Sequence, residues 1–256
     1  MKRFFAFLLL AVMACTVCSC ADEGKPSDYT FDELTAALAE ANDLKEALLV
    51  TESTAKVHYQ QSSLKKYDVD STQSAQTAFR RGDDGKLLEM SGDYTVKTKE
   101  EERFSVYYKD GFAYYNQDDR FTKEALDASV LDDRSLFEGF GKDEIEAYSA
   151  KEKKGVITVT FRVPWESTSE KIVALYAQLA DVMQSTGLTF SGVSYEDLSA
   201  TYRIDKKTGK LKGYTYEYSA TMKVDGKNVE VKGSATCTIS KTSGVTITAP
   251  DLSLYN

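Results

Sequence analysis

The sequence has few of the residues from which catalytic and metal sites are built. Its single histidine, His58, lies in the strand-like stretch KVHYQ. No G-x-S-x-G elbow, zinc-protease histidine pair or phosphate-binding glycine motif occurs. Adjacent acidic residues occur at 83–84, 118–119 and 132–133, but none has the spacing of an EF-hand loop. We therefore expect a protein that is not an enzyme, with no catalytic residues, no metal ligands and no cofactor. A surface calcium ion on one acidic pair remains the alternative.

Basic residues are fewer than acidic ones. The chain carries 40 acidic and 32 basic residues, for a formal net charge of -8. The lysines are dispersed, whereas nucleic-acid binding requires a basic face. After the N-terminal region, no apolar run reaches the ~20 residues that a membrane-spanning helix needs. These absences predict no nucleic-acid partner and no transmembrane helix.

Cysteine is rare except near the N-terminus, where three of the four cysteines fall within residues 15–20. Lys2 and Arg3 precede an apolar run at 4–14, which is too short to span a bilayer but suits an export signal. The tetrad VCSC at 17–20 resembles the lipobox of bacterial lipoproteins. This resemblance implies cleavage before Cys20 and transfer of a diacylglycerol to its thiol. Since two or more acyl chains anchor a protein stably, we expect the chain on the extracytoplasmic face of the bacterial cell membrane.

Other interpretations of this signal stay open. VMAC at 12–15 is a poorer lipobox because of its bulky methionine, CTVC at 15–18 would put valine beside the cleaved bond, and an ordinary export signal would leave the cysteines incidental. On the lipoprotein interpretation, residues 1–19 are the signal peptide, and residues 20–29 are the lipidated cysteine and a flexible tether. Residues 30–256 then form a single domain. Cys237 is its only thiol, which excludes an internal disulfide.

Two segments have the caps and spacing of helices. Thr30 and Glu33 form a capping box ahead of an apolar stripe, which predicts a helix from 31 that ends before the strand-like stretch at 50–60. A second capping box and a terminal glycine bound a predicted helix over 167–187. The stretch at 123–148 is ambiguous between a short helix and turns.

The rest of the chain has the alternation and turns of antiparallel strands. Asp110-Gly111 and Asp225-Gly226 each separate two alternating runs, as in two-residue hairpins, and Gly209 is placed for a positive φ in a longer one. The runs at 157–163, 214–224 and 229–239 are apolar at every second position, so one face of each should be buried. The tripeptide at 81–83, Arg-Gly-Asp, resembles an integrin-binding motif, but its glycines favour a plain turn.

Aromatic residues are concentrated in the predicted strands. Tyrosine has an apolar ring and a polar hydroxyl, which suits either a sheet surface packed on helices or the wall of a partly hydrated cavity. If a cavity lies between sheet and helices, the residues that we expect to line it are Tyr107, Phe112, Tyr114, Leu175, Leu179, Tyr214, Tyr216 and Tyr218.

The order of these features resembles a family of proteins. The lipobox, the N-terminal helix, VYYKDGFAYY, the middle helix and YRIDKKTGKLKGYTYEYSATMKVDGKNVEV are similar to an uncharacterised lipoprotein family of Gram-positive bacteria, which is itself similar to the LolA/LppX superfamily. The resemblance covers about residues 30–256. It implies an α+β fold, in which a strongly curved antiparallel sheet forms an incomplete barrel over a few helices. It also implies a hydrophobic ligand, a lipid or acyl chain, between them. The alternative function is a non-catalytic cell-envelope module that binds a protein or a wall polymer.

Overall fold

The computed structural model describes residues 24–62, 65–98, 100–128, 131, 140–164, 190–195, 198–224 and 226–255. The predicted signal peptide, Cys20 and the predicted helix at 167–187 lie outside these residues, and so do Leu175 and Leu179. The lipid anchor and the middle helix therefore stay predictions.

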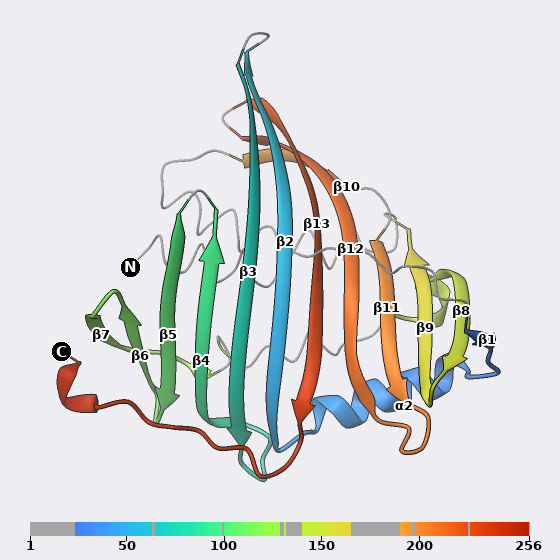
Figure 1. Cartoon of the computed structure of the whole chain (residues 1–256), viewed down its shortest axis with the longest axis horizontal. Helices are drawn as coiled ribbons and strands as arrows, with labels where there is room; N and C mark the ends of the chain where they lie inside the picture. Colours follow the sequence, from blue (N-terminus) through green and yellow to red (C-terminus); the bar gives the residue numbers. More distant parts are fainter. Residues whose placement is uncertain are drawn as a thin grey trace.

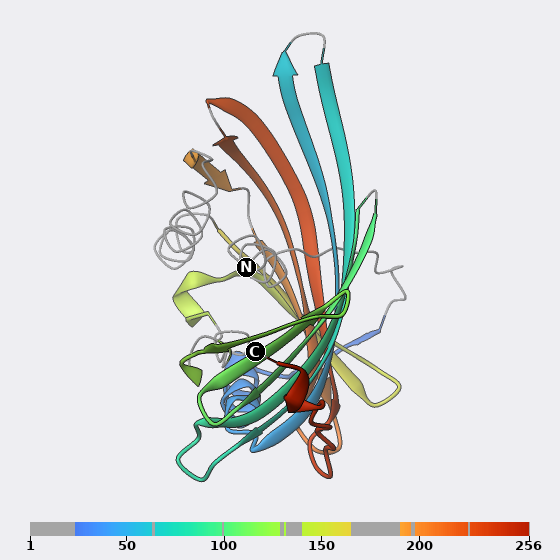
Figure 2. The same cartoon turned by 90° about the vertical axis from the view of Figure 1, so that its left-hand side faces the viewer.

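Most of the described chain forms one antiparallel sheet of 13 strands (Figure 1). The strands are β1 (Lys25–Pro26), β2 (Glu46–Ser62), β3 (Lys65–Arg81), β4 (Leu87–Lys97), β5 (Glu101–Lys109), β6 (Phe112–Gln117), β7 (Arg120–Ala125), β8 (Glu146–Lys153), β9 (Val156–Val163), β10 (Phe190–Tyr195), β11 (Leu198–Asp205), β12 (Leu211–Val224) and β13 (Lys227–Lys241). Their order in the sheet is β1-β8-β9-β11-β12-β13-β2-β3-β4-β5-β6-β7, and β10 pairs with β12 beyond the end of β11. No pairing joins β7 to β1 in the described chain, so the sheet is curved but open (Figure 2).

The predicted hairpins are confirmed where the structure describes them. Asp110 and Gly111 both have positive φ, 52° and 80°, between β5 and β6, as a two-residue turn requires. Gly209 has φ 73° in the longer connection of β11 to β12. Gly226 is described between β12 and β13, whereas its partner at 225 is not. These turns set the register of neighbouring strands, and hence which side chains share a face.

The single α-helix of the described residues, α2 (Phe31–Asn42), begins where the sequence predicts and ends before residue 50, as predicted. Thr30 Oγ1 accepts the Glu33 amide hydrogen at 3.2 Å, and the Glu33 carboxylate accepts the Thr30 amide hydrogen at 2.6 Å. The strand-like stretch was predicted from residue 50, but β2 already begins at Glu46. The reason is tertiary: residues 46–50 pair with β3, and residues 48–50 also pair with β13, which overrides their helix propensity.

Arg81 holds the turn between α2 and β2. Its guanidinium donates to the carbonyl oxygens of Asn42 at 3.0 Å and Leu44 at 3.2 Å, and lies 4.5 Å from the centre of the Phe79 ring. Arg81 is 8% exposed, so its side chain is buried in contacts within the protein. The tripeptide at 81–83 is thus a structural turn rather than a displayed adhesion motif.

The sheet has an inner face, packed against α2, and an outer face (Figure 2). Ile157, Val159, Phe161 and Val163 are all buried on the inner face, as their alternation predicts. Leu34 and Leu38 of α2 complete the same core cluster. None of the helices in the described residues is long and apolar enough to cross a membrane.

A C-terminal segment, residues 242–255, crosses the outer face and is called the strap below (Figure 1). After β13 it passes across β2 to β6 and ends in a short 3-10 helix, Leu252–Leu254. Val245 is buried against the sheet, and its amide and carbonyl bond to Glu46 and Arg80 at 3.4 and 3.1 Å. The strap thus covers part of a face that would otherwise be open to solvent.

Candidate functional site

The predicted cavity residues do not share one face of the sheet. Tyr214 and Tyr216 of β12 lie on the inner face with the core cluster. Tyr107, Phe112 and Tyr114 lie on the outer face, because Tyr107 pairs with Tyr114 and alternates with the inward residues of β5. The side chain of Tyr218 is outside the described part, as are Leu175 and Leu179. The sheet therefore separates two sets of residues that the sequence grouped together.

The tyrosines of the inner face form a continuous aromatic cluster. Tyr202 of β11 lies between Tyr214, Tyr216 and the Phe161 ring, with ring centres 5.6 to 6.2 Å apart. The hydroxyl oxygens of Tyr202 and Tyr216 are 2.8 Å apart and share a hydrogen bond. Burial raises the pKa of Tyr202 to about 12, so its hydroxyl stays protonated at neutral pH. Tyr202 and Tyr214 are fully buried, whereas Tyr216 is half-buried at the border of the core.

α2 closes the base of this cluster. Phe31 packs edge-on against Tyr148 and Phe161, at 6.1 and 6.3 Å between ring centres. The Tyr148 hydroxyl donates to the Tyr29 carbonyl oxygen at 2.8 Å, which ties β8 to the start of the helix. Large rings thus fill the space between α2 and the sheet, and this part of the inner face is a packed core.

Farther along β2 and β13, away from α2, the inner face carries small residues instead of large rings. Its inward residues are small: Ser53 pairs with Ala235, and Ala55 pairs with Gly233. Ser53, Ala55 and Ala235 are buried, at 3%, 7% and 7% exposure, yet lie outside the core cluster that contains α2. Tyr216 pairs directly with Ala235, so a large half-buried ring borders this small-residue region.

Charge is confined to the outer side of these strands. Along the described inward positions of β2, β9, β11, β12 and β13 no charged side chain occurs, while Glu52, Lys56, Glu217, Lys223 and Lys232 alternate with them and face outward. An apolar ligand held against these five strands would meet no charged side chain among their described inward residues.

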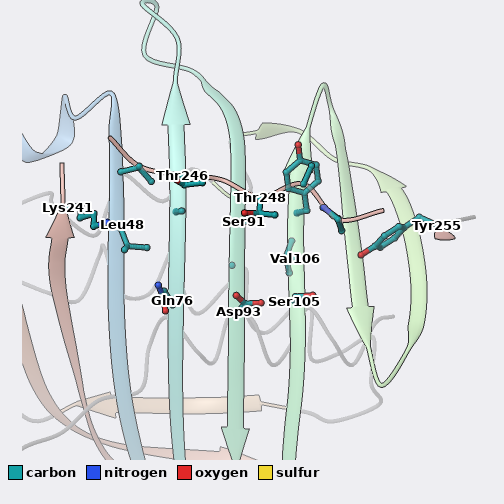
Figure 3. A pocket seen from close by; sticks show the side chains of 16 residues that line it. Leu48, Gln76, Ser91, Asp93, Ser105, Val106, Lys241, Thr246, Thr248 and Tyr255 are labelled. Carbon is teal, nitrogen blue, oxygen red and sulfur yellow. The ribbon is translucent and has the colours of Figure 1, made fainter. Parts of the chain in front are cut away.

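The outer face carries a groove of about 400 Å³ between the strap and the sheet, which we call the outer groove (Figure 3). Gln76 of β3, Asp93 of β4 and Ser105 of β5 form a row across its floor, since each pairs with the next in register. Thr246, Thr248 and Tyr255 of the strap line its opposite side. Polar side chains therefore face this groove from both sides.

Aromatic rings bound one end of the outer groove. Tyr255 stands edge-on to Tyr114 and to Phe121, with ring centres 5.4 and 5.2 Å apart. Lys123 lies over the rings of Phe112 and Tyr114, 4.3 and 5.5 Å from their centres. Three of the residues that the sequence predicts for a cavity, Tyr107, Phe112 and Tyr114, therefore lie at or beside this end of the outer groove. Of these three, Tyr107 lines the groove.

An ionic network fixes Tyr107 and the start of the strap. The Tyr107 hydroxyl donates to Glu89 Oε1 at 2.6 Å, and Lys109 and Arg80 pair with the same carboxylate at 3.4 and 3.3 Å. Partial burial raises the pKa of Glu89, but the Tyr107 hydrogen bond and the two cations outweigh it and lower the pKa. Burial, together with the bond to Glu89, raises the pKa of Tyr107. Tyr107 is therefore held as a neutral donor to an ionised carboxylate.

The sequence singled out neither the floor nor the strap of the outer groove. Gln76, Asp93 and Ser105 come from three different strands, and only strand register makes them neighbours. The alternation of each strand does predict that these three residues face outward. Polar residues on the outward face of a strand are the norm, however, so this signal does not indicate a binding site. Among the described residues, no cluster of histidine, cysteine or carboxylate side chains could hold a metal ion.

Comparison with known proteins gives distant structural neighbours. A DUF1329 family protein from Desulfovibrio piger matches with TM-score 0.26 at 10% identity, over 84% of this chain and 92% of that one. A beta-barrel-like DUF1849 protein from Brucella abortus matches with TM-score 0.19 at 8% identity, over 77% and 99%. Rv2717c from M. tuberculosis matches with TM-score 0.15 at 12% identity, over 80% and 98%. TM-scores this low carry no argument about fold or function.

No family model and no curated protein matches the chain. The resemblance to a Gram-positive lipoprotein family accordingly stays a prediction. The fold itself rests on the strand pairings described above: a curved, open antiparallel sheet with one helix packed on its inner face.

Proposed function

We propose that this chain is a non-catalytic, lipid-anchored binding protein of the extracytoplasmic face of the bacterial cell membrane. Its ligand is a lipid or another molecule with an acyl chain, held against the inner face in the manner of a LolA/LppX half-barrel. The anchor is the predicted diacylglycerol on Cys20.

The observation that carries the proposal is the change along the inner face. Near α2, large rings fill the space; beyond it, Ser53, Ala55 and Ala235 present small, buried, uncharged side chains beside the Tyr216 ring. An acyl chain placed there would remove its own apolar surface from water, at ~25 cal/mol per Å². The Tyr216 hydroxyl is already bonded to Tyr202, so the ring presents its apolar surface without an unpaired hydroxyl.

Uptake of an apolar fluorescent probe, phenylnaphthylamine, tests this proposal. We expect the full chain in detergent to enhance the probe's fluorescence and Tyr216→Glu to abolish the enhancement, because a carboxylate would have to be desolvated beside the ligand. Ser219→Glu, on the outward side of the same strand, is the matched control and should behave as the unmodified protein.

A second variant, Ala235→Trp, keeps the proposal testable if Tyr216→Glu does not fold. Ala235→Trp should fill the small-residue region and block uptake, whereas Lys232→Trp, on the exposed side of β13, should not. Melting temperature and near-ultraviolet circular dichroism report folding. Undiminished uptake by folded Tyr216→Glu and Ala235→Trp would refute a ligand site on the inner face.

A further inference from the structure

We propose that the outer groove is a second binding site, for a short linear carbohydrate of β-linked pyranose rings, and that it works independently of the inner face. Its floor, its rim and its direction across the strands each contribute to this assignment.

The floor of the outer groove is suited to hydroxyl groups. Gln76 offers an amide, Asp93 a carboxylate and Ser105 a hydroxyl, so the row contains both donors and acceptors. Gln76 and Asp93 are exposed, and Asp93 has no salt bridge to any described residue. Asn116 continues the row in register beside Ser105, and its side-chain oxygen is buried without a hydrogen-bond partner in the described chain. A ligand that brings hydroxyl groups would pair with the Gln76, Asp93 and Ser105 side chains, whereas Asn116 is not among the residues that line the groove.

The direction of the groove suits a linear chain of rings. Gln76, Asp93 and Ser105 lie on three adjacent strands, so successive polar groups are spaced by the strand separation, ~4.8 Å. That spacing is close to the length that one ring adds to an extended β-linked pyranoside. The strap runs alongside the row across the same strands, so it borders such a chain along its length (Figure 3).

The residues that line the outer groove disfavour acyl chains and anions as ligands. An acyl chain would cover Asp93 and Gln76 without replacing their hydrogen bonds to water, at a cost of about 1 to 3 kcal/mol for each buried unpaired group. An anionic ligand would face Asp93, with Lys241 as the one cation among the described lining residues. The partly exposed ring of Tyr255 instead provides apolar surface with a polar tip, against which the C–H face of a sugar ring can pack.

The strap provides further polar partners. It is fixed at Val245 by Glu46 and Arg80, and at Tyr255 by ring contacts, while no backbone hydrogen bond joins residues 246–250 to a described strand. Thr246 and Thr248 of the strap line the groove opposite the floor. A groove of about 400 Å³ lies within the ~300–1,000 Å³ range of small-ligand sites.

Calorimetric titration of the detergent-solubilised full chain with cellotetraose, a linear β-linked glucose tetramer, tests the proposal. We expect saturable binding, and at least tenfold weaker binding of maltotetraose, the curling α-linked isomer. Asp93→Ala and Tyr255→Ala should each weaken cellotetraose binding about tenfold. Glu217→Ala, an exposed residue outside the groove, is the matched control and should bind as the unmodified protein does.

Three results would overturn the assignment: no saturable heat with cellotetraose, equal affinity for both isomers, or unchanged affinity in folded Asp93→Ala. Uptake of phenylnaphthylamine by Asp93→Ala separates this proposal from that for the inner face. Uptake should be unchanged, because the two sites lie on opposite faces of the sheet, and its loss would contradict their independence.

Discussion

The two faces of the sheet are built from the same strands yet present opposite surfaces. On the inner face, Tyr202, Tyr214 and Phe161 pack into a core, and the described inward residues of β2, β9, β11, β12 and β13 include no charged side chain. On the outer face, tyrosines occur again, but Tyr107 donates to a carboxylate and Tyr114 lies beside Lys123 and Tyr255. Tyr107 and Tyr114 are also buried, at 3% and 9% exposure, so burial alone does not distinguish the two faces. The groups that surround each ring distinguish them.

This difference has an energetic consequence. Rings of the inner face contribute through apolar burial and packing, because removal of a buried ring leaves a cavity. Rings of the outer face contribute through hydrogen bonds and ion pairs whose strength depends on pH. The two faces should therefore respond differently to truncation and to acid.

The largest effect is expected for Phe161→Ala in the inner core. Phe161 is 1% exposed and contacts Phe31, Phe140 and Tyr202, so truncation should lower the free energy of unfolding by about 3–5 kcal/mol. Urea denaturation measures this loss. Phe112→Ala is the matched control: its ring is 38% exposed on the outer face, and its loss should cost about 1 kcal/mol or less. Equal costs would contradict the assignment of the core to the inner face.

A smaller, pH-dependent effect is expected for Tyr107→Phe on the outer face. The lowered pKa of Glu89 means that its ionised form stabilises the fold above the unfolded pKa of about 4.3, and that this contribution is lost as the pH falls through the folded pKa. Removal of the hydroxyl should cost about 1.5 kcal/mol at neutral pH and less at pH values below the folded pKa of Glu89.

Chemical denaturation at several pH values measures this difference. Tyr114→Phe is the control, because no hydrogen bond of the Tyr114 hydroxyl is found in the described chain and its ring contacts would remain. A stability difference for Tyr107→Phe that does not change with pH would show that Glu89 is not its energetic partner.

Local signals in the sequence were sufficient to predict much of the fold. The Thr30 cap, the Asp110-Gly111 turn and the alternation of 157–163 each depend on residues near one another in the chain, and the structure confirms all three. The early start of β2 was missed because residues 46–50 pair with β3, and residues 48–50 also pair with β13, which makes them strand. The positive φ of Asp118 and Asp119 makes that acidic pair a two-residue hairpin turn between β6 and β7.

The candidate sites depend on contacts between distant parts of the chain. The sequence predicts which residues share a face within one strand, but it does not reveal which faces of different strands coincide. Tyr107 and Tyr214 were grouped because both lie in tyrosine-rich strands, whereas register sets them on opposite sides of the sheet. The strap has no helical or alternating pattern strong enough to predict where it lies, and its attachment to Arg80 spans 165 residues of sequence.

The central claim is that the inner face holds a lipid. Native mass spectrometry of the full chain, purified in detergent from its own membrane, tests it most directly. We expect a non-covalent lipid adduct in the unmodified protein and in Lys232→Trp, but not in Ala235→Trp. We also expect a covalent diacylglycerol that Cys20→Ser removes. An unmodified protein without a lipid adduct, or an adduct that persists in folded Ala235→Trp, would contradict the claim.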